Sequence, residues 1–136
     1  MKITIPIAPK PQARPRFNSF SKRAYEDSAM TAYKKSVKYH VMACKPSLIE
    51  SGSLGVSITF YIYPPKKILS KKSAAQDLEN ETLYVDKKPD IDNYFKAVTD
   101  AAEGILYKND GQIAVVTMQK LYSLNPRTEI EVEELK

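Results

Sequence analysis

The segment Lys88-Pro-Asp-Ile-Asp-Asn-Tyr-Phe-Lys-Ala-Val-Thr-Asp100 carries more information than any other part of the chain. Pro89 favours extended backbone before it, and Asp90 is well suited to cap a helix, so the pattern predicts a helix that begins at Asp90. The helical spacing continues to about Glu103, where Gly104 is placed as the C-terminal cap. One side of this helix carries the apolar residues, which we expect to face the core: Phe95, Val98, Ala102 and Leu106.

Around this helix, the patterns of apolar residues predict one more helix and four strands. The predicted order is β-α-β-α-β-β, and a length of 136 residues fits one domain, residues 1–136. Residues 8–24 and 66–88 show no period and predict loops, of which the second is long and lysine-rich. The predicted elements are strands at residues 3–7, 54–63, 112–122 and 128–135, and a helix at residues 25–44 that buries Met30, Tyr33, Val37, Val41 and Cys44.

Composition excludes several classes of protein. No apolar run approaches the roughly 20 residues of a membrane span, and the first residues lack the length and cleavage site of a signal peptide. A lone Cys44 excludes an internal disulfide and favours a reducing compartment. One cysteine and one histidine also make a Cys/His metal site a poor interpretation. We expect a cytoplasmic protein without membrane contact.

The charge is more uneven than the net value of +5 indicates. Four acidic residues lie in the last eight positions, so residues 1–128 hold twenty Lys and Arg against twelve Asp and Glu, a balance of +8. Such a field attracts polyanions and suits contacts with phosphate more than reading of bases. Solubility alone is the competing interpretation, because many small proteins are modestly basic.

An acidic cluster lies inside this basic chain. Asp90 and Asp92 are two residues apart, Lys96 and Asp100 follow at four-residue steps, and Asp110 comes ten residues later. A helix cap and a solvated salt-bridge ladder would explain the pieces, and Asn-Asp-Gly is an ordinary turn. These structural explanations do not account for two carboxylates at one helix start. A hard cation such as Mg²⁺ would relieve the repulsion between them. Three carboxylates around one lysine therefore predict a metal-dependent nuclease.

Three segments together resemble a known family. Lys88-Pro-Asp-Ile-Asp-Asn-Tyr-Phe-Lys96, Asp100 and Tyr107-Lys-Asn-Asp-Gly-Gln-Ile113 are similar to the signature of the RusA family of Holliday junction resolvases, small endodeoxyribonucleases of bacteria and their prophages. The segment Pro11-Gln-Ala-Arg-Pro-Arg-Phe17 and the strand end at Tyr63-Pro-Pro65 resemble the family as well. The resemblance runs from Met1 to about Tyr122.

The resemblance implies a small α+β fold with a mixed sheet and two helices. It also implies a symmetric homodimer that resolves four-way junctions by paired nicks in DNA recombination and repair. It places Asp90, Asp92 and Asp110 on the family's catalytic metal ligands and Lys96 on its essential lysine, and Asn93 and Asp100 also match the pattern. One departure concerns Pro89, which stands where the well-studied member has an aromatic wedge; Tyr94 and Phe17 are the candidates to replace that wedge.

The expected mechanism is in-line hydrolysis assisted by one or two Mg²⁺ ions, with Mn²⁺ as a substitute. Lys96 would stabilise charge on the scissile phosphate or the leaving oxygen. Two alternatives stay open on the sequence: a nuclease for flaps or forks, and a DNA-binding accessory protein that does not cut. The expected phosphate contacts come from Arg14, Arg16, Lys66, Lys67, Lys71 and Lys72.

Overall fold

The centre of the protein is a mixed four-stranded sheet. The computed structural model describes residues 1–12, 16–18, 23–25 and 28–136, and for 16–18 and 23–25 it describes the backbone. The strand order is β1-β6-β4-β5, in which β4 and β5 are parallel and the other pairs are antiparallel. The strands are β1 Lys2–Ile5, β4 Leu54–Ile62, β5 Ile113–Tyr122 and β6 Arg127–Glu134. The predicted α+β class with a mixed sheet is confirmed.

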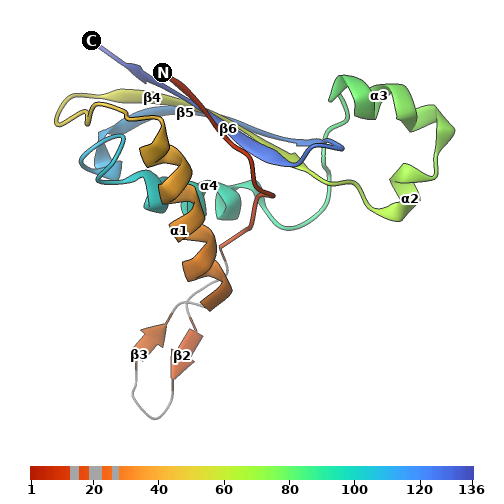
Figure 1. Cartoon of the computed structure of the whole chain (residues 1–136), viewed down its shortest axis with the longest axis horizontal. Helices are drawn as coiled ribbons and strands as arrows, with labels where there is room; N and C mark the ends of the chain where they lie inside the picture. Colours follow the sequence, from red (N-terminus) through yellow and green to blue (C-terminus); the bar gives the residue numbers. More distant parts are fainter. Residues whose placement is uncertain (13–15, 19–22, 26–27) are drawn as a thin grey trace.

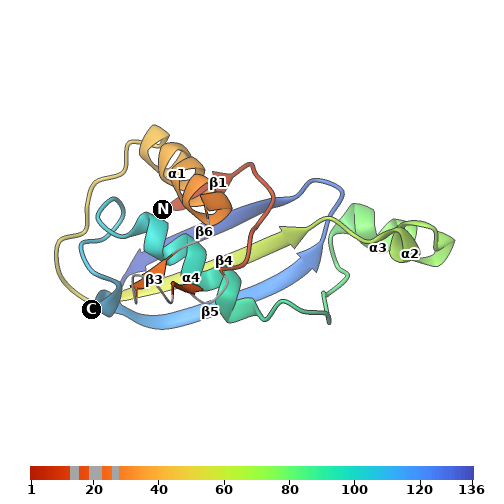
Figure 2. The same cartoon turned by 90° about the horizontal axis from the view of Figure 1, so that it is seen from below.

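Two helices, α1 Ser28–Ala43 and α4 Ile91–Ala102, lie on one face of the sheet (Figures 1 and 2). No described element covers the opposite face. Alternation explains this one-sided packing, because β6 points Ile130 and Val132 into the core and Glu131 between them outward. Gly104, with φ of 85°, follows the end of α4 as predicted.

The helix faces predicted to be buried are largely confirmed. On α4, Val98 and Ala102 are buried and Phe95 packs against the core. On α1 the prediction is wrong for Cys44, which is exposed because the helix ends at Ala43 and the chain turns away. Phe60 of β4 lies fully buried in the core.

An arm projects from one end of the sheet, beyond β4 and Pro64-Pro65 (Figure 1). The predicted loop over residues 66–88 is wrong here, because the arm contains three short helices. None is longer than six residues, which is too short to reveal a helical period in the sequence. They are α2 Lys66–Leu69, the 3₁₀ turn η1 Lys72–Ala74 and α3 Ala75–Asn80.

The root of the arm is fixed by a polar network. Arg127 of β6 donates two hydrogen bonds to the carboxylate of Glu81, at 2.7 and 3.0 Å, and a third to Glu129 at 3.1 Å. Its guanidinium also stacks on the ring of Tyr61 at 3.8 Å. The paired guanidinium lowers the pKa of Glu81, and Ser123 adds a hydrogen bond to the same carboxylate. The arm is therefore tied to the β5–β6 turn.

The N-terminal loop predicted over residues 8–24 contains a hairpin of β2 Arg16–Asn18 and β3 Arg23–Tyr25. That prediction is wrong because strands of three residues are too short to show alternation. Pro6 directly follows the last residue of the edge strand β1, where its missing N–H breaks no bond of the sheet. Among the helices described, none has the length and apolar character to span a bilayer.

Candidate functional site

The first candidate residue stands where α4 begins. Asp90 has the extended backbone of an N-cap, and its carbonyl accepts a hydrogen bond from the N–H of Asn93 at 3.1 Å. Its side chain makes no capping hydrogen bond, so the expectation that Asp90 caps the helix holds for the backbone and is wrong for the carboxylate. The exposed carboxylate of Asp90 is free to bind something else.

Asp92, in the first turn of α4, is likewise exposed. No hydrogen bond or ion pair joins its carboxylate, or that of Asp90, to another residue in the described part of the chain. The positive end of the helix dipole lowers the cost of placing two acids there, but only by about 0.3–1 kcal/mol each. Two unpaired carboxylates at one helix start are therefore available to a cation.

Further along α4, Lys96 and Asp100 form the ion pair that their spacing predicts. The Lys96 ammonium lies 2.9 Å from the Asp100 carboxylate, and Lys34 of α1 contacts the same carboxylate at 3.3 Å. Asp100 therefore bridges the two helices and has a structural role. The Lys96 side chain is 61% exposed, so its ammonium remains accessible to a ligand. Asp100 raises the pKa of Lys96, which keeps the ammonium charged.

Asp110 opens the 3₁₀ turn η2 Asp110–Gln112, directly before β5. Its N–H donates to the carboxylate of Glu103 at 2.8 Å, which places Asp110 beside the C-terminal end of α4. One oxygen of Asp110, Oδ1, is buried without a hydrogen-bond partner. Burial raises the pKa of Asp110, and the charges of Glu103 and Asp100 add to this, while Tyr107 and Lys96 act in the opposite direction.

The predicted acidic residues thus fall into two groups, one near each end of α4. Asp90 and Asp92 lie at its start, whereas Asp110 lies near Asp100 and Glu103, and a rise of 1.5 Å per residue separates Asp92 from Asp100 by about 12 Å. Among the residues described, no three Asp, Glu, His or Cys side chains are close enough together to hold a metal ion. Glu103 was not foreseen, although it continues the acidic stripe one turn beyond Asp100.

The residues at the helix start nevertheless fit a hard divalent cation. Mg²⁺ in nucleic-acid enzymes is commonly held by one or two carboxylates together with water and substrate phosphate. Asp90 and Asp92 supply two such carboxylates, both exposed and neither neutralised by a described partner. The donor chemistry fits the predicted metal, while the third predicted ligand, Asp110, is not gathered with them.

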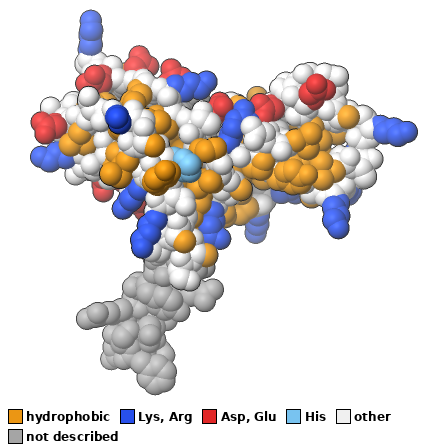
Figure 3. All heavy atoms as spheres, viewed as in Figure 1, with side chains coloured by type: hydrophobic (Ala, Val, Ile, Leu, Met, Phe, Trp, Pro, Cys, Tyr) orange, Lys and Arg blue, Asp and Glu red, His pale blue; other side chains and the backbone are white. Residues whose placement is uncertain are grey.

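The predicted DNA contacts lie on other parts of the molecule. Lys66, Lys67, Lys71 and Lys72 lie on the arm, and all four are exposed without an ion pair to any described acid. Figure 3 shows basic and acidic side chains around a hydrophobic patch on the arm. The arm therefore presents four unpaired lysines apart from the sheet.

The N-terminal segment approaches the start of α4. Gln12 donates its N–H to the carbonyl of Asn93 at 3.0 Å, so the chain passes beside the two acids before entering the hairpin. Arg14 lies outside the described residues, and Arg16 is described only by its backbone in β2. Phe17 is likewise described only by its backbone in β2.

Tyr94 is not available as a wedge for opening a junction. Its side chain is 5% exposed and packs against Phe60, with ring centroids 5.5 Å apart. The expectation that Tyr94 replaces the aromatic wedge is therefore wrong, because its position on α4 turns it into the core.

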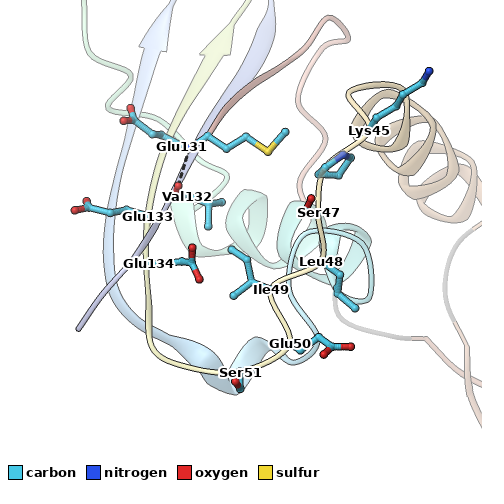
Figure 4. Close-up of a pocket in the computed structure, with 12 residues that line it drawn as sticks. Lys45, Ser47, Leu48, Ile49, Glu50, Ser51, Glu131, Val132, Glu133 and Glu134 are labelled. Carbon is cyan, nitrogen blue, oxygen red and sulfur yellow. Dashed lines mark hydrogen bonds between the residues drawn. The ribbon is translucent and has the colours of Figure 1, made fainter.

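A groove of about 920 Å³ lies elsewhere, between residues 45–51 and the end of β6 (Figure 4). None of the predicted metal-binding, catalytic or DNA-contacting residues lines this groove. Four glutamates line it, and the ammonium of Met1, which also lines it, donates to the carbonyl of Val132 at 2.9 Å. Negative charge of this kind repels phosphate, so the groove is a poor place for DNA. Its glutamates are Glu50, Glu131, Glu133 and Glu134.

The chain matches a known family over nearly its whole length. The family model described as endodeoxyribonuclease RusA matches residues 6–133. An uncharacterized protein of Bacillus subtilis (strain 168), YqaN, is 31% identical over 137 residues, which cover 99% of this chain and 96% of that protein. The family match spans α4, the arm and η2.

Proposed function

The chain belongs to the RusA family of endodeoxyribonucleases, and on that premise we propose that it is a divalent-metal-dependent nuclease that resolves four-way DNA junctions in recombination and repair. The observation that carries this proposal is the pair Asp90 and Asp92, exposed and unpaired at the start of α4 with Lys96 one turn away. We place its action in the cytoplasm of a bacterium, on chromosomal or prophage DNA.

Nucleases of this family generally depend on a divalent metal. Asp90 and Asp92 would hold Mg²⁺, with Mn²⁺ as a substitute, and the bound ion would supply a hydroxide nucleophile and neutralise charge on the phosphate. Lys96 would bring a positive charge to the same phosphate. The buried, unpartnered oxygen of Asp110 supports a catalytic role for that carboxylate, and Asn93 supports the turn that presents Asp90.

The lysines of the arm are proposed to contact DNA backbone. Replacing Lys66, Lys67, Lys71 and Lys72 with alanine should weaken binding to junction and linear duplex alike, because phosphate contacts carry no sequence information. The slope of log affinity against log salt should flatten by roughly 0.9 for each phosphate that the variant no longer neutralises. Fluorescence anisotropy over a salt series measures this slope, and an unchanged slope would show that the arm does not touch DNA.

Two symmetric nicks in one junction need two active sites, and one chain offers one acidic helix start. We therefore propose a homodimer, since an isologous two-fold protein matches a two-fold substrate. Light scattering at low micromolar concentration should give about twice the chain mass of 15.4 kDa. A monomer, both alone and on junction DNA, would exclude paired nicking and favour a nuclease that makes single cuts.

The substrate is tested by comparing labelled four-way junction, flap, fork and linear duplex of matched sequence in one cleavage assay with Mg²⁺. Preferential cutting of the four-way junction supports the proposal. Preferential cutting of the flap or fork would assign the same acids to another branched substrate. Binding of branched DNA without cutting any of the four would favour the accessory protein.

A further inference from the structure

The segment between the arm and α4, residues 83–89, runs along the outer edge of β5 as a strap. The N–H of Tyr122 donates to the carbonyl of Leu83 at 2.9 Å, and the N–H of Val85 donates to the carbonyl of Lys120 at 3.0 Å. These bonds are those of a short antiparallel pairing, with a bridge between Tyr84 and Leu121. The strap connects the arm directly to Asp90.

After Val85 this backbone pairing stops among the described residues, and one side chain continues it. The Lys120 ammonium donates to the carbonyl of Lys87 at 2.8 Å and to that of Pro89 at 2.9 Å. Every second residue of the strap is therefore anchored to β5. Leu83 and Val85 are held by backbone hydrogen bonds, and Lys87 and Pro89 are held by the Lys120 side chain. Pro89 lacks an N–H, so its carbonyl is its sole hydrogen-bonding group.

The anchored carbonyl belongs to the residue immediately before Asp90. Asp90 makes no side-chain capping hydrogen bond of its own, so the backbone at positions 89 and 90 sets where its carboxylate points. Catalytic groups are sensitive to such placement, because an error of about 1 Å costs as much as a hundredfold in rate. Lys120, on the strand β5, holds this backbone from the side.

We propose that Lys120 is a positioning residue for Asp90, acting through the carbonyls of Lys87 and Pro89. The proposal rests on the nuclease function proposed above and adds a residue whose ammonium is held by two backbone carbonyls. Its neighbour Gln119 bonds Thr59 at 3.0 Å and makes no described contact with the strap, which provides a matched control on the same strand.

The test compares Lys120→Met with Gln119→Met. Each variant loses side-chain hydrogen bonds, but only Lys120→Met releases the strap. We expect Lys120→Met to lower kcat for junction cutting by about 10- to 100-fold with KM and metal-free junction binding unchanged. Gln119→Met should keep the wild-type kcat, and Lys120→Arg should recover most of it, because the guanidinium restores charge and donors. If Lys120→Met does not fold, Lys120→Gln takes its place in the comparison.

Amide hydrogen exchange over residues 86–92 gives a second readout that needs no cutting. Exchange there should be faster in Lys120→Met than in the wild type and unchanged in Gln119→Met. A wild-type kcat in Lys120→Met, a change confined to KM, or unaltered exchange would each overturn the positioning role. A wild-type protein that cuts no DNA would instead refute the nuclease proposal, while exchange would still decide whether Lys120 holds the strap.

Discussion

Asp90→Asn and Asp92→Asn should each lower the rate of junction cutting by about a hundred- to a thousandfold, the scale expected when a charge-stabilising group is lost from an active site. Asparagine keeps the shape of the side chain but lacks the negative charge that holds a hard divalent cation. Neither carboxylate has a described partner in the fold, so the thermal stability of both variants should stay close to that of the wild type. Junction binding should be equal or tighter, because a negative charge facing phosphate is removed.

Cutting is measured on denaturing gels with Mg²⁺, and binding is measured without metal. Asp86→Asn is the matched control, since Asp86 is an exposed acid four residues before Asp90 and makes no described hydrogen bond. The control should cut at the wild-type rate. If Asp90→Asn or Asp92→Asn also cuts near that rate, the residue concerned is not a metal ligand, and the acidic helix start is a structural feature only.

Lys96→Met should lower kcat by about a hundredfold, because it removes a cation placed one turn away from Asp92. The fold should tolerate this change, since Asp100 keeps its ion pair with Lys34 at 3.3 Å. The raised pKa of Lys96 leaves its ammonium protonated to higher pH than usual. Wild-type cutting should therefore show no loss from deprotonation of Lys96 below about pH 10.

Lys108→Met is the control for the loss of one positive charge, because Lys108 is exposed and lies two residues before Asp110. Steady-state cutting at saturating junction, measured from pH 6 to pH 10, separates the two variants. Equal kcat values for Lys96→Met and Lys108→Met would show that Lys96 has no catalytic role and only neutralises Asp100. The same experiment shows whether the alkaline limb of the wild-type profile moves when Lys96 is absent.

The elements with long regular patterns could be predicted from the sequence. The helix at α4, its buried side and the strands β4, β5 and β6 were predicted to within one or two residues, because each repeats its spacing over at least eight positions. The helices of the arm and the β2–β3 hairpin were not predicted, because elements of three to six residues are too short to show a repeating pattern of apolar residues. Their helical or extended backbone depends on contacts that local sequence does not encode.

For the site, local spacing predicted the ion pair of Lys96 and Asp100, because residues four apart meet on a helix. It could not predict that Asp110 packs beside Glu103 rather than beside Asp92, since that depends on how the chain returns after α4. The contacts that lysines make with residues of other elements could not be predicted from the sequence either. Lys34 reaches Asp100 from another helix, and Lys120 reaches Pro89 from a strand 31 residues away.

The most direct test of the account is cutting of a synthetic four-way junction by the wild-type protein in parallel reactions with Mg²⁺ and with a chelator. We expect nicks at symmetric positions in two opposing strands with Mg²⁺, none with the chelator, and none with Asp90→Asn in either reaction. A junction left intact by the folded wild-type protein with Mg²⁺ or Mn²⁺, or cut equally well by Asp90→Asn, would contradict it.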